Sequence, residues 1–189
     1  MYSIGGFDGT LSTVNLSNGN TTFVGDNGFA LTGLAFDTAF ANLYSLNNNG
    51  GALVRMNAND ASAVIVGGGG NNMLDLSMNS AGVLFGGGFG GIGTFDITTG
   101  AFTAIGGSLT WTAIAFDEND QLFGIDIDSD ALYRIDSATG NATLVGGDIG
   151  GDVRGMSFAY SRNNVPEPGV LALVSLGLLG VAASRRNKA

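Results

Sequence analysis

An internal repeat with a period of about 40 residues runs through most of this 189-residue chain. An Asn or Asp that follows an apolar residue recurs at spacings of 42, 39 and 40 residues, and a Gly that follows an apolar residue recurs at the same three spacings. The first landmark comprises Asn15, Asn57, Asp96 and Asp136, and the second comprises Gly25, Gly67, Gly106 and Gly146. Two independent landmarks that keep one period indicate four copies of a single structural unit.

Each copy divides into four short segments that have the composition of β-strands, rich in Val, Ile, Phe, Tyr and Thr. In the clearest copy these segments are residues 112–117, 121–125, 131–136 and 142–145. The five residues 136–140 predict a turn, because Asp136 can accept backbone hydrogen bonds and Gly140 tolerates a positive φ. The second copy has Ala61 in place of this Gly, so we expect a different turn there.

A period near 40 residues with four strands per copy predicts a β-propeller. One such sheet cannot bury both of its faces, whereas stacking the sheets around an axis covers their aromatic residues. We expect an all-β domain over residues 1–162, with four blade-like repeats that form a closed four-bladed propeller or part of a larger one. Equivalent strands should carry Phe36, Leu76, Phe116 and Phe158. A β-solenoid or β-sandwich is the alternative, but its repeats would normally be shorter or less regular.

The two ends of the chain differ in the phase of the repeat. The first copy begins at its second strand, residues 2–4, and residues 154–160 are expected to form an extra strand of the first type after the fourth copy. That strand could complete the first blade and close a ring. Residues 1–6 have neither the basic start nor the apolar stretch of a signal peptide, so we expect the natural protein to extend beyond them.

The last 25 residues, 165–189, differ in composition from the repeats. They comprise Pro166, Glu167 and Pro168, an uncharged apolar stretch at 169–184, and a basic end with Arg185, Arg186 and Lys188. A cluster of cations after an apolar run marks the end that stays in the cytoplasm. The pattern therefore predicts a linker at 163–168, a transmembrane helix at 169–184 and a basic cytoplasmic tail at 185–189.

The length of the apolar stretch leaves an alternative open. Its sixteen residues, 169–184, would rise about 24 Å as a helix, which is shorter than a hydrocarbon core of about 30 Å. A buried core helix is therefore conceivable on length alone. The cationic cluster at the end favours the membrane, since Arg side chains can reach the interface and extend the effective span.

This order of parts resembles the PEP-CTERM sorting signal of bacterial surface proteins, on the residues Pro166, Glu167 and Pro168, the apolar stretch and Arg185 with Arg186. The resemblance implies recognition by a membrane-embedded exosortase that cleaves near the Pro-Glu-Pro motif. It also implies an exported precursor, anchored in the inner membrane by its helix, whose mature form belongs to the cell surface or the exopolysaccharide matrix. Residues 132–147, LYRIDSATGNATLVGG, are similar to the propeller blades of bacterial secreted proteins.

Composition excludes several classes of function. The chain has no His and no Cys, which rules out Ser-His-Asp triads, Cys-His pairs and the usual zinc sites. Apart from the tail, which holds Glu167 and three cations, residues 1–164 carry 15 acidic and 4 basic side chains, a net charge of −11. Such a charge disfavours binding to nucleic acid, which begins with cations neutralising phosphates.

We therefore predict a binding or structural module rather than an enzyme, with no catalytic residue and no cofactor. Extracellular polysaccharide is the expected ligand, because a surface rich in Asn, Thr, Gly and Asp can hydrogen-bond sugar hydroxyls. The alternative is an extracellular propeller enzyme that acts on polysaccharide through Asp side chains.

Three local patterns give candidate sites. Trp111 is the only Trp; a packed position is the first interpretation and a stacking platform for a sugar ring is the second. Asp126, Asp128 and Asp130 begin like a calcium loop and could bind calcium weakly, although the required Gly and the final Glu are absent. Residues 86–91 match the glycine spacing of a dinucleotide site, but a strand follows where a helix is required.

Overall fold

Fifteen β-strands in four antiparallel sheets make up the part of the chain that the computed structural model describes, residues 1–5, 8–69, 72–150 and 153–158. No helix occurs among these residues, so the all-β class is confirmed for them. The 40-residue repeat corresponds to one sheet per copy. In every sheet, strands that follow one another in sequence are also neighbours in space, which is the order of a simple meander.

Sheet 1 consists of β1 (Tyr2–Ile4), β2 (Thr10–Val14) and β3 (Thr21–Asp26). Sheet 2 consists of β4 (Leu31–Phe36), β5 (Asn42–Asn47), β6 (Leu53–Asn57) and β7 (Ala63–Gly67). Sheet 3 consists of β8 (Met73–Met78), β9 (Leu84–Gly88), β10 (Gly91–Phe95) and β11 (Phe102–Gly106). Sheet 4 consists of β12 (Trp111–Phe116), β13 (Leu122–Asp126), β14 (Ala131–Ile135) and β15 (Ala142–Gly146).

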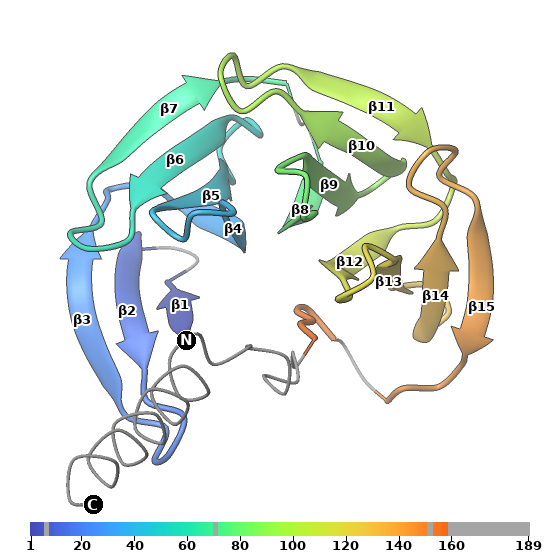
Figure 1. Cartoon of the computed structure of the whole chain (residues 1–189), viewed down its shortest axis with the longest axis horizontal. Helices are drawn as coiled ribbons and strands as arrows, with labels where there is room; N and C mark the ends of the chain where they lie inside the picture. Colours follow the sequence, from blue (N-terminus) through green and yellow to red (C-terminus); the bar gives the residue numbers. More distant parts are fainter. Residues whose placement is uncertain (6–7, 70–71, 151–152, 159–189) are drawn as a thin grey trace, which may run out of the picture. The chain divides into compact units, whose positions relative to one another are not determined.

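The sheets follow one another around a common centre, as the blades of a propeller do (Figure 1). The first strand of each sheet lies innermost, and the last strand, β3, β7, β11 or β15, lies outermost. Successive sheets touch through their inner strands, since β4 packs against β8 and β8 packs against β12. This arrangement is consistent with a four-bladed propeller.

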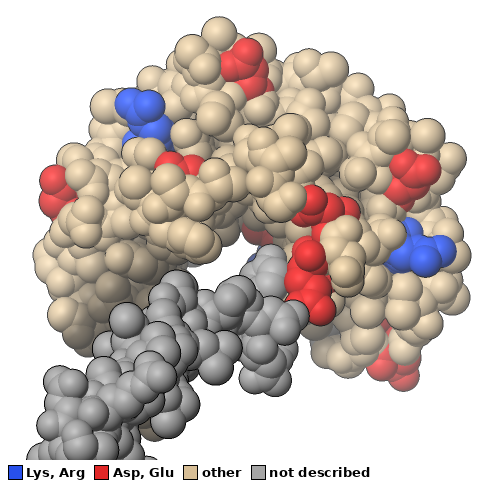
Figure 2. Space-filling view, viewed as in Figure 1, with Lys and Arg blue, Asp and Glu red and all other residues tan. Residues whose placement is uncertain are grey.

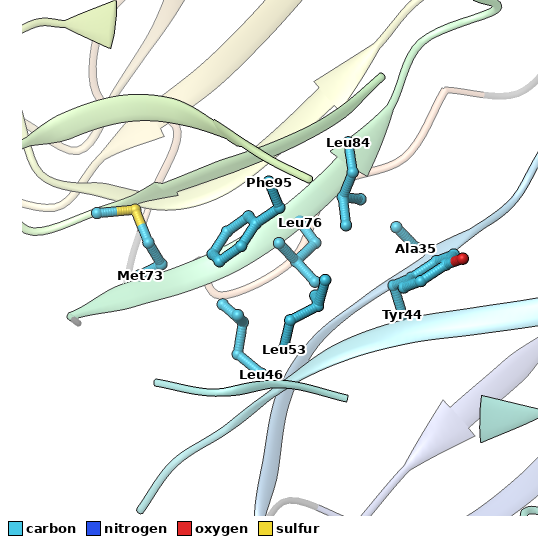
Figure 3. Packing of buried hydrophobic residues seen from close by; sticks show 8 residues of the cluster. All are labelled: Ala35, Tyr44, Leu46, Leu53, Met73, Leu76, Leu84 and Phe95. Carbon is cyan, nitrogen blue, oxygen red and sulfur yellow. The ribbon is translucent and has the colours of Figure 1, made fainter. Parts of the chain in front are cut away.

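The hydrophobic core lies between successive sheets. Figure 3 shows the cluster between sheets 2 and 3, in which Leu46 and Leu53 of sheet 2 approach Leu76 and Phe95 of sheet 3. The rings of Phe85 in sheet 3 and Phe116 in sheet 4 meet edge to face, with their centroids 5.1 Å apart. Apolar residues therefore join the sheets into one unit, which extends from Met1 to Phe158.

The predicted turn between the third and fourth strands is confirmed. In the last copy the N–H of Gly140 donates to the carbonyl of Asp136 at 2.8 Å, and Gly140 has a φ of 76°. The expectation of a different turn in the second copy is wrong. Ala61 takes the same left-handed conformation, with a φ of 60°, and its N–H donates to the carbonyl of Asn57 at 3.0 Å. Burial of the Ala61 side chain offsets part of its backbone strain.

Two expectations about the first strands need correction. Phe36 and Phe116 pair with Leu43 and Leu122, but the residue of β8 that pairs with the equivalent Leu84 is Met78. Leu76 therefore lies in the equivalent strand, two residues before the predicted position. Phe36 and Met78 are 42 residues apart, which is also the first spacing of the Asn and Gly landmarks, whereas the prediction used a spacing of 40.

Phe158 does not lie in a strand. Residues 153–158 have no regular secondary structure; the other two residues of the predicted strand, 159–160, lie outside the described residues. The ring of Phe158 packs on Phe123 of sheet 4, with centroids 5.2 Å apart, and no strand ladder joins this segment to sheet 1. Within the described ranges sheet 1 accordingly has three strands rather than four, and residues 153–158 do not close the ring as a last strand.

The linker at 163–168, the helix at 169–184 and the basic tail at 185–189 lie outside the described residues. Within the described ranges, no helix has the length and apolar character that a membrane crossing requires.

Candidate functional site

A polar cleft of about 480 Å³ opens between sheets 2 and 3. Its walls come from the β4 and β8 inner strands, the β5–β6 turn, the end of the β7–β8 connection and the β9–β10 turn. The lining residues are Thr32, Asn47, Asn48, Gly50, Gly51, Asn72, Met73, Leu74 and Phe89. The cleft is therefore built from two different copies of the repeat.

The β5–β6 turn forms the wall on sheet 2. The side-chain oxygen of Asn47 accepts the N–H of Asn49 at 3.0 Å, and the carbonyl of Asn47 accepts the N–H of Gly51 at 2.8 Å. Gly50 and Gly51 both have a positive φ, of 118° and 70°, which glycine adopts at little cost. Asn48 lies at the exposed tip of this turn, and its N–H donates to the carbonyl of Ala30 at 2.8 Å.

The opposite wall belongs to sheet 3. The N–H of Phe89 donates to the carbonyl of Asn72 at 2.9 Å, which fixes the β9–β10 turn against the start of β8. Gly88 is required beside this bond, because a Cβ there would stand 2.6 Å from the Cα of Met73. The Phe89 ring remains 55% exposed at the cleft. A large aromatic surface is thus held at a polar opening.

Hydrogen bonds connect the strands at the base of the cleft. The hydroxyl of Thr32 donates to the carbonyl of Leu74 at 3.0 Å and joins the inner strands of sheets 2 and 3. On sheet 2, the buried hydroxyl of Ser45 donates to the carbonyls of Thr32 and Gly33, at 3.1 and 2.6 Å. The Thr32–Leu74 bond thus ties the two walls together, and the Ser45 bonds connect β4 to β5 within sheet 2.

The chemistry of the cleft is neutral. None of its lining residues is charged. The side-chain amides of Asn48 and Asn72 are exposed and bond to no other group in the part of the chain that the structure describes. Each amide offers two donors and one acceptor, which suits hydroxyl groups that both donate and accept. The exposed face of the molecule in Figure 2 shows scattered carboxylates and isolated cations rather than a patch of one sign.

A second hollow, of about 410 Å³, lies on sheet 4 and is more charged. Its lining comprises Asp120, Gln121, Arg134, Ile135, Asp136, Ser137, Asn141 and Thr143. Hydrogen bonds within the protein already occupy several of these groups. The carboxylate of Asp120 accepts from the N–H of Ser80 at 2.9 Å and from its hydroxyl, and Gln121 donates to the carbonyl of Ile135 at 2.9 Å. The Ser80 hydrogen bonds also lower the pKa of Asp120. We regard this hollow as the weaker candidate.

Asp75 is a buried carboxyl that the sequence argument missed. It lies in β8, at a position where the other inner strands carry Gly33 and Ala113, beside a bulge in the pairing with β9. Burial raises the pKa of its carboxyl to about 7, although hydrogen bonds from the N–H groups of Ile114 and Leu76 act in the opposite direction. A charged residue inside an apolar strand was the available signal. Asp75 bonds toward sheet 4 and does not line the cleft.

Trp111 is fully buried, and its indole packs edge to face on Tyr133 with centroids 5.8 Å apart. Gly124 makes room for it, because a Cβ there would stand 2.7 Å from the indole ring. The structure thus supports the packed interpretation, and no face of this ring is open to a sugar. Among the described residues, its Nε1 is the one buried side-chain polar atom without a hydrogen-bond partner.

The three carboxylates of the predicted calcium loop play different parts. Asp126 is buried; one of its oxygens accepts the N–H of Thr110 at 2.9 Å, and the other accepts the N–H and hydroxyl of Ser129 at 3.1 and 2.7 Å. Asp128 and Asp130 are exposed. In the described ranges no three acidic residues are grouped so that they could hold a metal ion. Weak calcium binding here stays a prediction.

Residues 86–91 form the hairpin between β9 and β10, as the sequence indicated, and no helix follows them. The glycine spacing of this segment therefore has no relation to a dinucleotide site.

Comparison with known families confirms the C-terminal signal. The model of the PEP-CTERM protein-sorting motif matches residues 164–186. This motif marks exported proteins that are processed by an exosortase, a membrane protein. No curated protein sequence matches the chain.

Solved structures similar to the chain are β-propeller-like proteins. One is a Bacteroides thetaiotaomicron protein of unknown function (TM-score 0.65, 15% identity, 76% of this chain and 44% of that one). Another is the nidogen/laminin complex (TM-score 0.65, 13% identity, 82% and 64%). A third is the PQQ-bound aldose sugar dehydrogenase of Streptomyces coelicolor (TM-score 0.63, 15% identity, 84% and 68%). The chain thus spans less than two thirds of the first two proteins, and these likenesses concern the fold alone.

Proposed function

We propose that the protein is exported, is held at the inner membrane by residues 169–184, and reaches the cell surface or the exopolysaccharide matrix after an exosortase processes it. The match of residues 164–186 to the sorting motif supports this route. The apolar stretch between Pro168 and the Arg185–Arg186 pair has the composition of a membrane helix with its basic end in the cytoplasm.

At that location the propeller-like unit acts as a binding module for an uncharged extracellular polysaccharide. One observation carries this proposal: the cleft between sheets 2 and 3 combines the exposed Phe89 ring with the unengaged amides of Asn48 and Asn72, and its lining has no charge. Aromatic rings pack on the apolar faces of sugars, and amides bond to their hydroxyls. An uncharged lining favours a neutral ligand, because an ionised ligand would lose hydration without gaining a counter-charge.

Affinity electrophoresis of the full-length protein in mild detergent tests this function. The gels would contain hydroxyethyl cellulose, dextran or galactomannan as neutral probes, and alginate as an anionic one. We expect retardation by at least one neutral polymer and a loss of roughly tenfold in affinity for Phe89→Ala. Phe23→Ala is the matched control, since Phe23 is also an exposed Phe but lies on β3 of sheet 1. Equal retardation of both variants, or retardation by alginate alone, would contradict the cleft as the site.

An extracellular propeller enzyme acting on polysaccharide is the second candidate. Asp75 is the observation that favours it, because a carboxyl with a pKa of about 7 can exchange a proton near neutral pH. Its burial and its bond toward sheet 4 favour a structural role instead. Reducing-end assays on the same polysaccharides separate the two functions. New reducing ends that disappear in Asp75→Asn would support the enzyme.

A further inference from the structure

A repeated contact joins the outer part of each sheet to the next sheet. Its first half, which we call the seat, is the apolar residue and Gly near the end of the outermost strand. Its second half, which we call the plug, is the turn before the outermost strand of the following sheet. The seats are Val24–Gly25, Val66–Gly67 and Ile105–Gly106, and their plugs are residues 57–61, 96–100 and 136–140.

In each of these three junctions the backbones of seat and plug lie so close together that the seat position has room only for glycine. A Cβ on Gly106 would stand 2.8 Å from the carbonyl oxygen of Thr139, and one on Gly140 would stand 2.5 Å from the carbonyl carbon of Gly106. A Cβ on Gly67 would collide with the carbonyl of Thr99 in the same way, and a Cβ on Gly25 would collide with the carbonyl of Asp60. In all three contacts the backbone of the seat meets the backbone of the plug. The contact therefore depends on the conformation of the turn more than on its side chains.

The junctions also remove apolar surface from water. The last residue of each internal plug, Ala61, Gly100 or Gly140, is buried. The apolar residue of each internal seat, Val24, Val66 or Ile105, is partly buried and packs on the core between the sheets. In the plug of sheet 3, Ile97 packs on that core as well.

Sheet 1 carries a preformed plug that meets no seat among the described residues. In residues 15–19 the N–H of Gly19 donates to the carbonyl of Asn15 at 2.8 Å, and the N–H of Ser17 donates to the Asn15 side chain at 2.8 Å. The same two bonds, at the same lengths, form the plug at Asp136. Yet Leu16, the counterpart of Ile97, is 77% exposed, and no atom of the described chain lies within 4 Å of a Cβ placed on Gly19.

Sheet 4 carries the complementary seat, on which no plug lies in the part of the chain that the structure describes. Val145 is 55% exposed, whereas its counterparts at the internal junctions are packed. A Cβ on Gly146 or Gly147 would meet nothing within 4 Å among the described residues. Neither the seat, Val145–Gly146, nor the plug, residues 15–19, contains a charged side chain, so no charge repulsion between these residues opposes their contact.

We propose that the protein associates head to tail, with the plug of sheet 1 in one copy docking on the seat of sheet 4 in a second copy. At the three internal junctions a seat of this kind accepts a plug. Residues 15–19 form a turn with the same hydrogen bonds as those plugs. Such a contact is heterologous, so it generates a closed ring or an open series of copies. The inference does not depend on polysaccharide binding.

Substitutions can block each half without disturbing the fold. Gly146→Val fills the seat: it adds side chain into open space and at a backbone conformation that any residue adopts, but it would collide with a docked plug. Leu16→Glu places a charge on the exposed plug residue. Val64→Glu is the matched control, because Val64 is also exposed, on β7, but belongs to neither surface. Circular dichroism and thermal unfolding should show all three variants folded.

The protein mass of the full-length chain in mild detergent would be measured by light scattering during size-exclusion chromatography. We expect multiples of the monomer mass for the unmodified protein and Val64→Glu, and the monomer mass for Gly146→Val and for Leu16→Glu alone. An equimolar mixture of these two variants keeps one intact plug and one intact seat, so it should give a dimer of twofold mass and nothing larger. A monomeric unmodified protein, association that persists in both variants, or a mixture without dimer would each overturn the proposal.

Discussion

Gly33 of β4 and Asp75 of β8 approach so closely that a Cβ added to Gly33 would stand 2.9 Å from the Cα of Asp75. Gly33 also has a φ of 65°, in the left-handed region that favours glycine. This contact lies between the inner strands of sheets 2 and 3, beside the bond from Thr32 to Leu74 that forms the base of the cleft. The distance between sheets 2 and 3 therefore depends on the absence of a side chain at Gly33.

Gly33→Ala should destabilise the protein by about 1–3 kcal/mol, because the methyl group would meet the backbone of β8 and the left-handed conformation would become strained. Gly28→Ala is the matched control. Gly28 has a similar φ of 73° but open space around its missing Cβ, so it tests the conformational strain alone. Urea unfolding of the two variants measures the difference. Equal destabilisation would show that the contact with Asp75 contributes nothing.

Asp75 should make the stability of the propeller-like unit fall as the pH rises from about 4 to about 7. The folded pKa of about 7 exceeds the ordinary value of 3.8, so the native state holds a proton that the unfolded chain has released over this range. Below this pH range the carboxyl is protonated in both states and its ionisation costs no stability. Above the range the native state must bury a charged carboxylate, and the loss of stability is complete.

The measurement is urea unfolding at pH 5 and pH 8 of the unmodified protein and Asp75→Asn. The amide cannot ionise, yet its oxygen can still accept the N–H of Ile114, which bonds to Asp75 at 2.8 Å. The stability of the variant should decrease much less between pH 5 and pH 8 than that of the unmodified protein. An undiminished decrease would assign the pH dependence to other groups.

Polysaccharide binding in the cleft should depend little on salt. The lining has no charged residue, so no ion pair with the ligand is available for screening. Between about 0.05 and 0.5 M NaCl the affinity for a neutral polysaccharide should change by less than about twofold. A loss of tenfold or more over the same range would indicate an ionic site, of which the hollow around Arg134 and Asp136 is the available example.

Deletion of residues 165–189 should release the protein into the medium when it is expressed behind a signal peptide in a cell that has an exosortase. The physical reason is that the apolar stretch and its basic end are removed together. Deletion of residues 188–189 alone is the control, since it leaves the matched motif at 164–186 complete. Immunoblots of medium and membrane fractions decide the outcome. Membrane retention after the larger deletion would show that another part of the protein anchors it.

Local sequence determined the strands and most of the turns. The predicted segments 112–117, 121–125, 131–136 and 142–145 agree within one residue at each end with β12 to β15. The reason is that a turn such as 136–140 is specified by its own Asp and Gly, through bonds that span only a few residues. The sorting motif could be recognised from the sequence for the same reason, because its three parts follow one another directly in the chain.

Tertiary structure alone decided the candidate site. Asn48 and Phe89 come from different copies of the repeat, and only the packing of sheet 2 on sheet 3 brings them to one cleft. Packing also placed Trp111 against Gly124 and raised the pKa of Asp75 to about 7, and neither the partner of the indole nor the burial of the carboxyl follows from the order of the residues. Periodicity tells which residues are equivalent, whereas burial, solvation and the lining of a cleft depend on which equivalent surfaces meet.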